Sequence, residues 1–398
     1  MQITPANYSA NFDNFLLTDP QNVREKLASV IGGITLYNAG LPNYPYNFTR
    51  DSILSGILMK DPVMLREQLI FSSLLQGDAK NPYTGEEPGK IFHQMPGMRQ
   101  SNLSTEYNAC DTTALFLYGH EIYLDLTNDY YFIERQKKYL EKAVSYILSH
   151  LVNYLFVEDP KLSNAKRFAL KLTYWKDSQV PNRKDGYPLY PAVFTLAHVQ
   201  NMRALKSAAK LLKSPSLLET VNEMKRHLSI LFDEKRGVFA SGIDQKGFFP
   251  GTSSDNLHML YYLEPGDISD EKINKIIKNT SSLESSLGYI TLKTKDEWLS
   301  NDITVHTGYH SDSVWPFEQA FIHAGALKFG LKSVARICER IYSHIDGFYP
   351  ELFRLIDGKF HSTGCHTQLW TIGARIYFDR YFSKSEKRIS KSETNLNE

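Results

Sequence analysis

The chain has 398 residues, of which 42% are hydrophobic and 22% are charged, and 45 Lys and Arg nearly balance 44 Asp and Glu to give a formal net charge of +1. This balance argues against nucleic acid as a partner, because proteins that bind nucleic acid carry a basic surplus on one face. No basic amphipathic stretch indicates binding to a membrane surface. The length allows one large domain or two average ones, so the pattern of helices must decide between them.

The N-terminal segment and the cysteines bear on the cellular compartment. Residues 1–14 have neither a basic start nor an apolar run, and no stretch is long enough to span a bilayer. Cys110, Cys338 and Cys365 are an odd number without metal-ligand spacing, which predicts reduced thiols. We therefore expect a cytoplasmic protein. Export by a signal-peptide-independent secretion system is the alternative, since such a system could read the polar C-terminal segment.

Apolar residues recur at three- and four-residue spacing in twelve segments, separated by loops rich in Gly, Pro, Asn and Asp. Asp61-Pro62 and Ser214-Pro215 place proline in a first helical turn, which marks two helix starts. Two short pieces, 237–240 and 289–293, predict hairpins on one rim, and nothing predicts a large sheet. The predicted helices span residues 20–31, 51–60, 62–76, 111–126, 130–151, 191–213, 215–232, 254–263, 268–281, 315–329, 331–345 and 366–383.

These helices predict a single all-α domain, residues 1–382, in which paired helices close into an (α/α)6 toroid. An open solenoid is the alternative, but the helices share no repeated signature at a fixed period. Residues 383–398 are too polar to bury and predict a disordered tail. In a toroid the loops at one end of the inner helices converge, so residues far apart in the sequence can face one pocket.

Several loops combine aromatic rings with charges, a combination suited to sugars because flat rings stack on sugar faces. In residues 44–52, YPYNFTRDS, Arg50 and Asp51 offer a forked donor and an acceptor for vicinal hydroxyls, beside the ring of Tyr46. Asp51 could instead cap the following helix. In residues 85–93, GEEPGKIFH, Glu87 and Lys90 are candidates for lining a pocket, although such a loop is more often simply solvated.

Further along the chain, Asp111 opens an apolar helix, where it could cap the helix or contact a hydroxyl. In YWKDS, residues 174–178, Asp177 follows Trp175, and a carboxyl held against an indole can stay protonated as a general acid. The segment 308–318 contains His310 and Trp315. Glu351 lies in a short aromatic loop, where a carboxylate is costly unless it is paired or useful.

Glycoside hydrolysis requires two carboxyl groups, one protonated to release the leaving oxygen and one ionised on the other side of the sugar. With 44 acidic residues in the chain, chemistry alone does not select the pair.

The segments resemble motifs of the glucoamylase and amylo-alpha-1,6-glucosidase (glycogen-debranching) families of six-hairpin glycosidases. FTRDS at 48–52 is similar to the segment with which glucoamylases grip the terminal glucose. The resemblance spans residues 44 to 374, and the other motifs that carry it are GEEPGKIFH (85–93), NACDTTALF (108–116), YWKDS (174–178), YHSDSVWPFEQAFIHAG (309–325), YPELF (349–353) and GCHTQLWTIGA (364–374).

The resemblance implies an inverting exo-acting enzyme that releases glucose from glycogen, starch or malto-oligosaccharides without a metal or an organic cofactor. It implies Asp177 as general acid and Glu351 as general base. Arg50, Asp51 and Trp315 would bind the sugar, with Asp111 and His310 as neighbours. Glucoamylases place glutamate near the position where this sequence has Lys176-Asp177. The assignment of the general acid is therefore open by one residue.

The alternatives are an α-1,6-specific debranching enzyme, a trehalase-like disaccharide hydrolase and a carbohydrate-binding protein that has lost catalysis. Many relatives carry an N-terminal β-sandwich domain, whereas this chain begins almost at the catalytic helices. The expected partner is an α-glucan or oligosaccharide substrate, and the sequence identifies no protein partner.

Overall fold

Two kinds of helix alternate along the computed structural model, which describes residues 19–178, 180, 186–293 and 309–394. Every residue of α2 (Thr49–Met59) is buried, whereas α5 (Tyr130–Ser149) buries one face through residues spaced three and four apart, such as Phe132, Gln136 and Leu140. A helix buried all round must lie inside the molecule, and an amphipathic one must lie at the surface. The sequence of each helix thus sets its layer.

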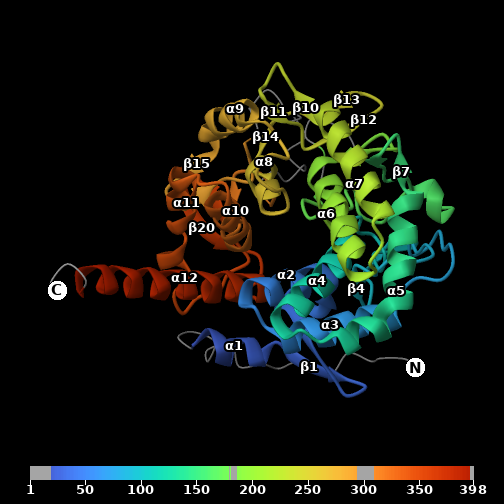
Figure 1. Cartoon of the computed structure of the whole chain (residues 1–398), viewed down its shortest axis with the longest axis horizontal. Helices are drawn as coiled ribbons and strands as arrows, with labels where there is room; N and C mark the ends of the chain where they lie inside the picture. The colour runs from blue at the N-terminus through green and yellow to red at the C-terminus, as the bar shows by residue number, and fades with distance from the viewer. Residues whose placement is uncertain (1–18, 179, 181–185, 294–308, 395–398) are drawn as a thin grey trace.

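The buried helices form a closed inner ring, and the amphipathic helices surround it (Figure 1). Each inner helix contacts the next one along the chain, and α12 returns to pack against α2, which closes the ring. The inner helices are α2, α4 (Thr112–Thr127), α6 (Thr195–Leu211), α8 (Asp255–His258), α10 (Pro316–Lys328) and α12 (Leu369–Thr394). The outer helices are α1 (Pro20–Lys26), α3 (Pro62–Leu74), α5, α7 (Ser216–His227), α9 (Asp270–Thr280) and α11 (Lys332–Glu339). The predicted α/α toroid is confirmed.

Several helix ends differ from the prediction. The first helix stops at Lys26, because residues 28–31 pair as a strand with residues 34–37. α6 begins at Thr195 rather than at residue 191, since Val193 and Phe194 form a strand. At the C-terminus α12 continues to Thr394, past residue 383, where the polar tail was expected to begin. The Ser, Lys, Glu and Arg residues there extend an existing helix and so avoid the cost of nucleating a new one. Residues 395–398 and 1–14 lie outside the described residues.

The sheet at one end of the ring was not predicted. It contains β1 (Ala28–Ile31), β2 (Ile34–Leu41), β3 (Tyr44–Phe48), β4 (Gln94–Met95) and β21 (Thr367–Gln368), the last paired with β2. A second sheet joins β18 (Ser313–Val314), β19 (Leu352–Ile356) and β20 (Lys359–Thr363). Both sheets bring together segments that are distant in the sequence.

The remaining strands are short. Hairpins are present at both expected places, where β10 (Phe232–Asp233) pairs with β11 (Val238–Phe239) and β15 (Glu284–Ser285) pairs with β16 (Gly288–Tyr289). Residues 292–293 form β17 (Leu292–Lys293), which pairs with the distant strand β14 (Thr252–Ser253). The others are β5 (Arg99–Gln100), β6 (Leu103–Ser104), β7 (Leu151–Val152), β8 (Leu155–Phe156), β9 (Val193–Phe194), β12 (Gly242–Asp244) and β13 (Gly247–Phe248).

The hydrophobic core fills the space between the two layers of helices. Its largest cluster includes Ile53 of α2, Leu115 of α4, Leu205 of α6 and Phe321 of α10, and each of these is at most 1% exposed. Cys110, Cys338 and Cys365 are buried free thiols, as predicted. Among the described residues, no helix combines the length and the hydrophobicity that crossing a membrane requires.

Candidate active site

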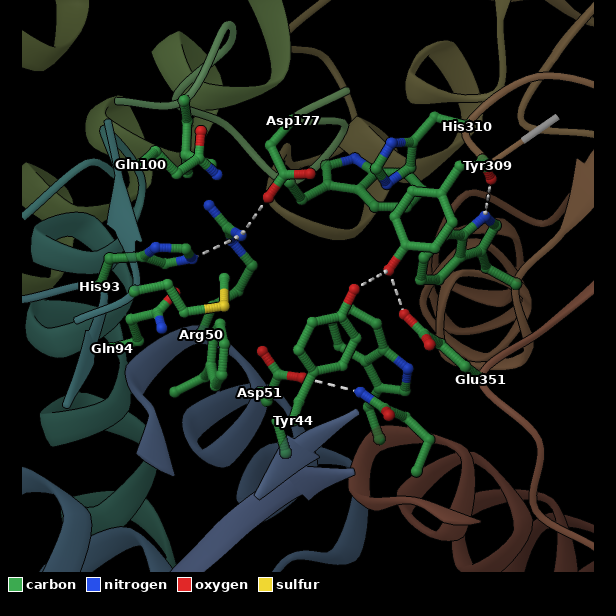
Figure 2. A pocket seen from close by; sticks show the side chains of 18 residues that line it. Tyr44, Arg50, Asp51, His93, Gln94, Gln100, Asp177, Tyr309, His310 and Glu351 are labelled. Carbon is green, nitrogen blue, oxygen red and sulfur yellow. Dashed lines mark hydrogen bonds and ion pairs between the residues drawn. The ribbon is translucent and has the colours of Figure 1, made fainter. Parts of the chain in front are cut away.

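A cavity of about 190 Å³ lies at the end of the ring where the two sheets meet the inner helices (Figure 2). It gathers Arg50, Asp51, Asp177, Trp315 and Glu351, which the toroid prediction placed in one cleft. The complete lining comprises Ala39, Tyr44, Phe48, Arg50, Asp51, His93, Gln94, Met98, Gln100, Leu170, Trp175, Asp177, Tyr309, His310, Trp315, Glu351, Gln368 and Trp370.

Arg50, at the start of α2, supplies the positive charge of the cavity lining, and Asp111 on the side away from the cavity fixes its position. Its Nε and Nη2 atoms donate to the two carboxylate oxygens of Asp111, each at 2.9 Å. The remaining guanidinium nitrogen, Nη1, lies 3.4 Å from His93 Nε2 and 4.0 Å from an oxygen of Asp177. The bidentate pair fixes the guanidinium plane, so Nη1 points into the cavity beside Asp177.

Asp177 has the surroundings of a proton donor. Its side chain is 27% exposed, and burial raises its pKa to about 7. Arg50 opposes this shift, while the charges of Asp111 and Glu351 add to it. A carboxyl with a pKa near neutrality holds its proton for a substantial part of the time at pH 7 and can deliver it to a leaving group.

Glu351 lies across the cavity from Asp177 and is held by two donors (Figure 2). The Tyr309 hydroxyl donates to Oε1, and the backbone N–H of Cys365 donates to Oε2 at 2.8 Å. Burial raises the pKa of Glu351, and both hydrogen bonds act against that rise because they stabilise the charged form. The hydroxyl of Tyr309 is also 3.2 Å from the hydroxyl of Tyr44.

A third carboxyl, Asp51 of α2, lines the floor of the same cavity (Figure 2). Its Oδ1 accepts a hydrogen bond of 3.0 Å from Gln368 Nε2 of β21. Burial raises its pKa to about 8, with Arg50 opposing the shift and Glu351 adding to it. Asp51 therefore carries a proton at neutral pH and can donate as well as accept, as a contact to a sugar hydroxyl requires.

Aromatic rings form the wall between Asp177 and Glu351. His310 stacks on Trp315 with a centroid distance of 4.9 Å and an interplanar angle of 10°, and Trp175 meets Trp315 edge to face at 5.7 Å. Burial lowers the pKa of His310 well below its usual value, so this ring is neutral. Trp370 lies edge-on to Trp315 at 5.4 Å. These rings give the cavity an apolar side against which a sugar face can pack.

Glu87, Lys90 and Asp111, three of the predicted contacts, do not line the cavity. Lys90 is completely buried and pairs with Glu87 at 3.4 Å and with Glu158 at 3.9 Å, while His150 lies 3.0 Å from Glu87. The charges of that loop therefore neutralise one another inside the protein. Asp111 acts behind Arg50, where both its oxygens are used.

Tyr46 is also outside the lining, and its neighbours Tyr44 and Phe48 take the cavity positions on β3. The rings of Tyr44 and Phe48 are 5.7 Å apart although the residues are four positions apart on the strand, so the two side chains converge. The pairing of β3 with β2 shifts register between Tyr44 and Asn47, so the regular alternation of side chains is interrupted at Tyr46.

Sequence reasoning missed several lining residues, among them the polar side chains of Tyr44, His93, Tyr309 and Gln368. Tyr44 and His93 stand inside segments that were singled out, and Tyr309 immediately precedes His310. Gln368 reaches the site only because β21 pairs with β2. A predicted sheet at this end would have brought Gln368 next to Asp51, but the short strands gave no such signal.

One group of residues has the composition of a metal site. Oxygen or nitrogen atoms of Asp255, His258 and Glu318 lie within 4.8 Å of one another, behind Trp175 and outside the cavity. The ammonium of Lys176 is 2.9 Å from Asp255 and 3.6 Å from Glu318. A positive charge already occupies the centre of this group, which therefore does not fit a resident metal ion.

No protein-family model and no curated protein matches the sequence. Solved structures do match. The GH63 mannosylglycerate hydrolase from Thermus thermophilus in complex with glucose has 12% sequence identity and a TM-score of 0.64, covering 90% of this chain and 98% of that one. The same enzyme in complex with Tris and D-glycerate has 11% identity and a TM-score of 0.64, with the same coverage of both chains.

A second kind of match is the rhamnosidase from Klebsiella oxytoca with rhamnose bound, at 13% identity and a TM-score of 0.56, covering 87% of this chain and 60% of that one. At these identities the likeness shows the fold, and the structures that share it here are glycoside hydrolases of the toroid type. None of those named is a glucoamylase or a debranching enzyme, so the narrower expectation from the sequence motifs is not confirmed.

Proposed function

We propose that the protein is an inverting glycoside hydrolase that removes one sugar from the end of its substrate, with Asp177 as general acid and Glu351 as general base. The observation that carries the proposal is the pair of carboxyl groups on opposite sides of one cavity, in different surroundings. Asp177 has a pKa of about 7, and Glu351 accepts two hydrogen bonds that favour its charged form. Inverting hydrolysis needs one acid and one base in this arrangement.

In this mechanism Glu351 takes a proton from a water molecule, whose oxygen attacks the anomeric carbon. The bond from that carbon to the leaving oxygen breaks, and Asp177 gives its proton to the leaving oxygen. Arg50 and Asp51 hold the sugar hydroxyls on the floor of the cavity, and the indole of Trp315 lies against the sugar. Each group acts from a position fixed by contacts to the rest of the fold.

The small cavity favours a single terminal sugar. Its volume of about 190 Å³ is below the roughly 300–1,000 Å³ typical of sites that enclose larger ligands. The sequence motifs favour glucose released from an α-glucan, with α-1,6-debranching and trehalase-like disaccharide hydrolysis as the alternatives. The similar structures point instead to small glycosides, because the hydrolase from Thermus thermophilus acts on mannosylglycerate. Both specificities use the same two carboxyl groups.

The test is a substrate panel with identification of the sugar released. Maltose, isomaltose, trehalose, glycogen, mannosylglycerate and an α-rhamnoside are each incubated with the protein and, as control, with the Glu351→Gln variant. Glucose from maltose and glycogen would support the glucoamylase-type specificity. Release of mannose or rhamnose would support glycoside hydrolysis but would show that the enzyme is specific for a sugar other than glucose. Binding without any product would favour a carbohydrate-binding protein that lacks catalysis.

A further inference from the structure

The three residues before Asp177 share one polar partner. Trp175 Nε1 donates to Asp255 Oδ1 at 3.0 Å, and the Lys176 ammonium lies 2.9 Å from the same oxygen. The Tyr174 hydroxyl donates to Asp255 Oδ2 at 3.4 Å. Asp255 is 2% exposed, stands at the start of α8 and does not line the cavity. A single carboxylate from an inner helix therefore holds three consecutive side chains of the segment that carries the proposed acid.

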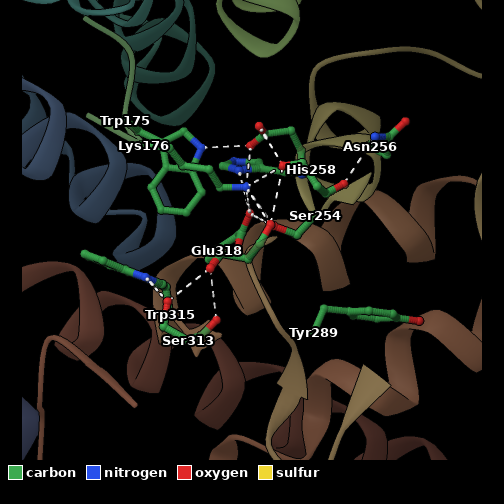
Figure 3. Close-up of polar contacts among 12 residues, drawn as sticks. Trp175, Lys176, Ser254, Asn256, His258, Tyr289, Ser313, Trp315 and Glu318 are labelled. Carbon is green, nitrogen blue, oxygen red and sulfur yellow. Dashed lines mark hydrogen bonds and ion pairs between the residues drawn. The ribbon is translucent and has the colours of Figure 1, made fainter. Parts of the chain in front are cut away.

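Lys176 strengthens this attachment through other acceptors (Figure 3). Its ammonium donates to Ser253 Oγ at 2.7 Å, to Ser254 Oγ at 2.9 Å and to the carbonyl oxygen of Thr291 at 3.1 Å. An ammonium has only three protons, so it is fully satisfied here. Lys176 points into the ring, whereas its neighbour Asp177 lines the cavity. The buried residues 174–176 therefore anchor the backbone from which Asp177 extends.

The groups around the Lys176 ammonium make Asp255 its nearest carboxyl partner. Burial lowers the pKa of His258 to about 3, so this ring is neutral, and burial raises the pKa of Glu318 to about 7. Asp255 is the nearer of the two carboxyl groups to the Lys176 ammonium, at 2.9 Å against 3.6 Å for Glu318. Both oxygens of Asp255 accept hydrogen bonds, Oδ1 from Trp175 and Oδ2 from Tyr174 and Ser253, and Oδ1 also faces the Lys176 ammonium.

We infer that Asp255 is a positioning residue that fixes the place of the Asp177 carboxyl through Tyr174, Trp175 and Lys176. The inference rests on the proposed function, because it assumes that Asp177 donates a proton in the reaction. Proton transfer needs the carboxyl within hydrogen-bond reach of the leaving oxygen, and a misplacement of about 1 Å can cost on the order of 100-fold in rate. A buried carboxylate that never touches the substrate would thus control the acid step.

Asp255→Asn is the variant that tests this inference. An Asn side chain keeps the size but turns one oxygen into an NH2 group, which would face the hydroxyl donors of Tyr174 and Ser253 or the nitrogens of Trp175 and Lys176. Glu318 remains beside Lys176, so the variant keeps an acceptor for the buried ammonium. The substitution should therefore weaken the contacts of residue 255 with residues 174–176, which we call the clamp, while Lys176 keeps its other hydrogen-bond acceptors.

The readout is the dependence of kcat on the leaving group. A misplaced acid should slow substrates with a sugar alcohol as leaving group by at least ~10-fold and the matching glycosyl fluoride, which needs little acid assistance, by less than ~3-fold. The matched control is Glu121→Gln, which removes another buried carboxylate that pairs with Arg203 at 2.8 Å and lies on α4. That control should change both substrates equally. Equal losses on both substrates in Asp255→Asn would overturn the inference.

A second variant covers the case in which Asp255→Asn does not fold. Tyr174→Phe removes only the hydroxyl that donates to Asp255 and leaves every charge in place. It should show the same selective loss on poor leaving groups at a reduced size, roughly 2–5-fold. An unchanged ratio between the two kinds of substrate in this variant would count against the clamp.

Amide hydrogen exchange separates this inference from the proposed function. If the wild-type protein cleaves no glycoside, the proposed function fails, but the clamp still predicts faster exchange in residues 174–177 of Asp255→Asn than in Glu121→Gln. Equal exchange in that segment would show that Asp255 does not hold it, whatever the protein catalyses.

Discussion

Gly364→Ala should displace the proposed base without touching any other catalytic group. Gly364 follows β20 and has φ +81°, and a Cβ atom there would lie 2.2 Å from Glu351 Oε2 and 2.8 Å from its Cδ. Ordinary contacts between such atoms lie near ~3.5 Å, so the carboxylate must move by about 1 Å. That movement also weakens the hydrogen bond to Oε2 from the backbone N–H of Cys365. We expect kcat to fall by roughly 100-fold.

Gly358→Ala is the matched control for that variant. Gly358 lies in the turn between β19 and β20 with φ +75°, and a Cβ there meets no atom within 4 Å. Alanine in this left-handed conformation costs about 1–2 kcal/mol at either position, so Gly358→Ala reproduces the backbone cost without the contact to Glu351. Only Gly364→Ala should lose activity. Steady-state kinetics on the substrate found by the panel, with thermal unfolding of both variants, gives the comparison. Equal kcat values for the two variants would refute the placement of Glu351 as the base.

Three further predictions follow from the same site. Asp177→Asn and Glu351→Gln should each lower kcat by at least ~100-fold, with Asp177→Asn most harmful on poor leaving groups; near-normal turnover would remove that residue from the mechanism. An α-linked substrate should yield the β-anomer first in an NMR time course, and appearance of the α-anomer first would reject inversion. In a substrate complex the two carboxyl groups should lie roughly 6.5–9.5 Å apart, which leaves room for the attacking water. Since burial raises the pKa of Asp177 to about 7, kcat/KM should decline above that pH. The folded protein then holds a proton between pH 3.8 and about 7 that the unfolded chain has lost, so the free energy of unfolding should decrease as pH rises through that window, and less steeply in Asp177→Asn.

The helices could be predicted because their burial follows a simple period. α5 buries residues three and four apart, and α2 is buried on every side, which together distinguish an outer from an inner helix. The sheet beside the cavity could not be predicted in this way. Its strands β4 and β21 have two residues each, too few for any alternation to show, and they pair with partners distant in the sequence. Such pairing is set by the closed ring rather than by local propensity.

The site could be predicted in part. The motifs that resemble six-hairpin glycosidases identified Arg50, Asp51, Asp177 and Glu351, all of which line one cavity. The error with Lys90 has a physical cause: a charged residue in a loop has the same local sequence whether it faces a pocket or a buried counter-ion. Only the packed structure shows that Glu87 and Glu158 neutralise it.

The roles of the carboxyl groups depend on neighbours that no local segment contains. Asp51, Asp177 and Glu351 share one cavity, and the nearby guanidinium of Arg50 is already paired with Asp111 on two of its nitrogens. Three like charges so close together cannot all be ionised, which is why burial and mutual repulsion hold protons on this site at neutral pH. Glu351 accepts two hydrogen bonds that favour its charged form, whereas the nearest cation to Asp177, Arg50, is 4.0 Å away, which supports Glu351 as the proposed base and Asp177 as the proposed acid. In the proposed mechanism, the assignment of acid and base thus follows from which carboxyl group the fold supplies with hydrogen-bond donors.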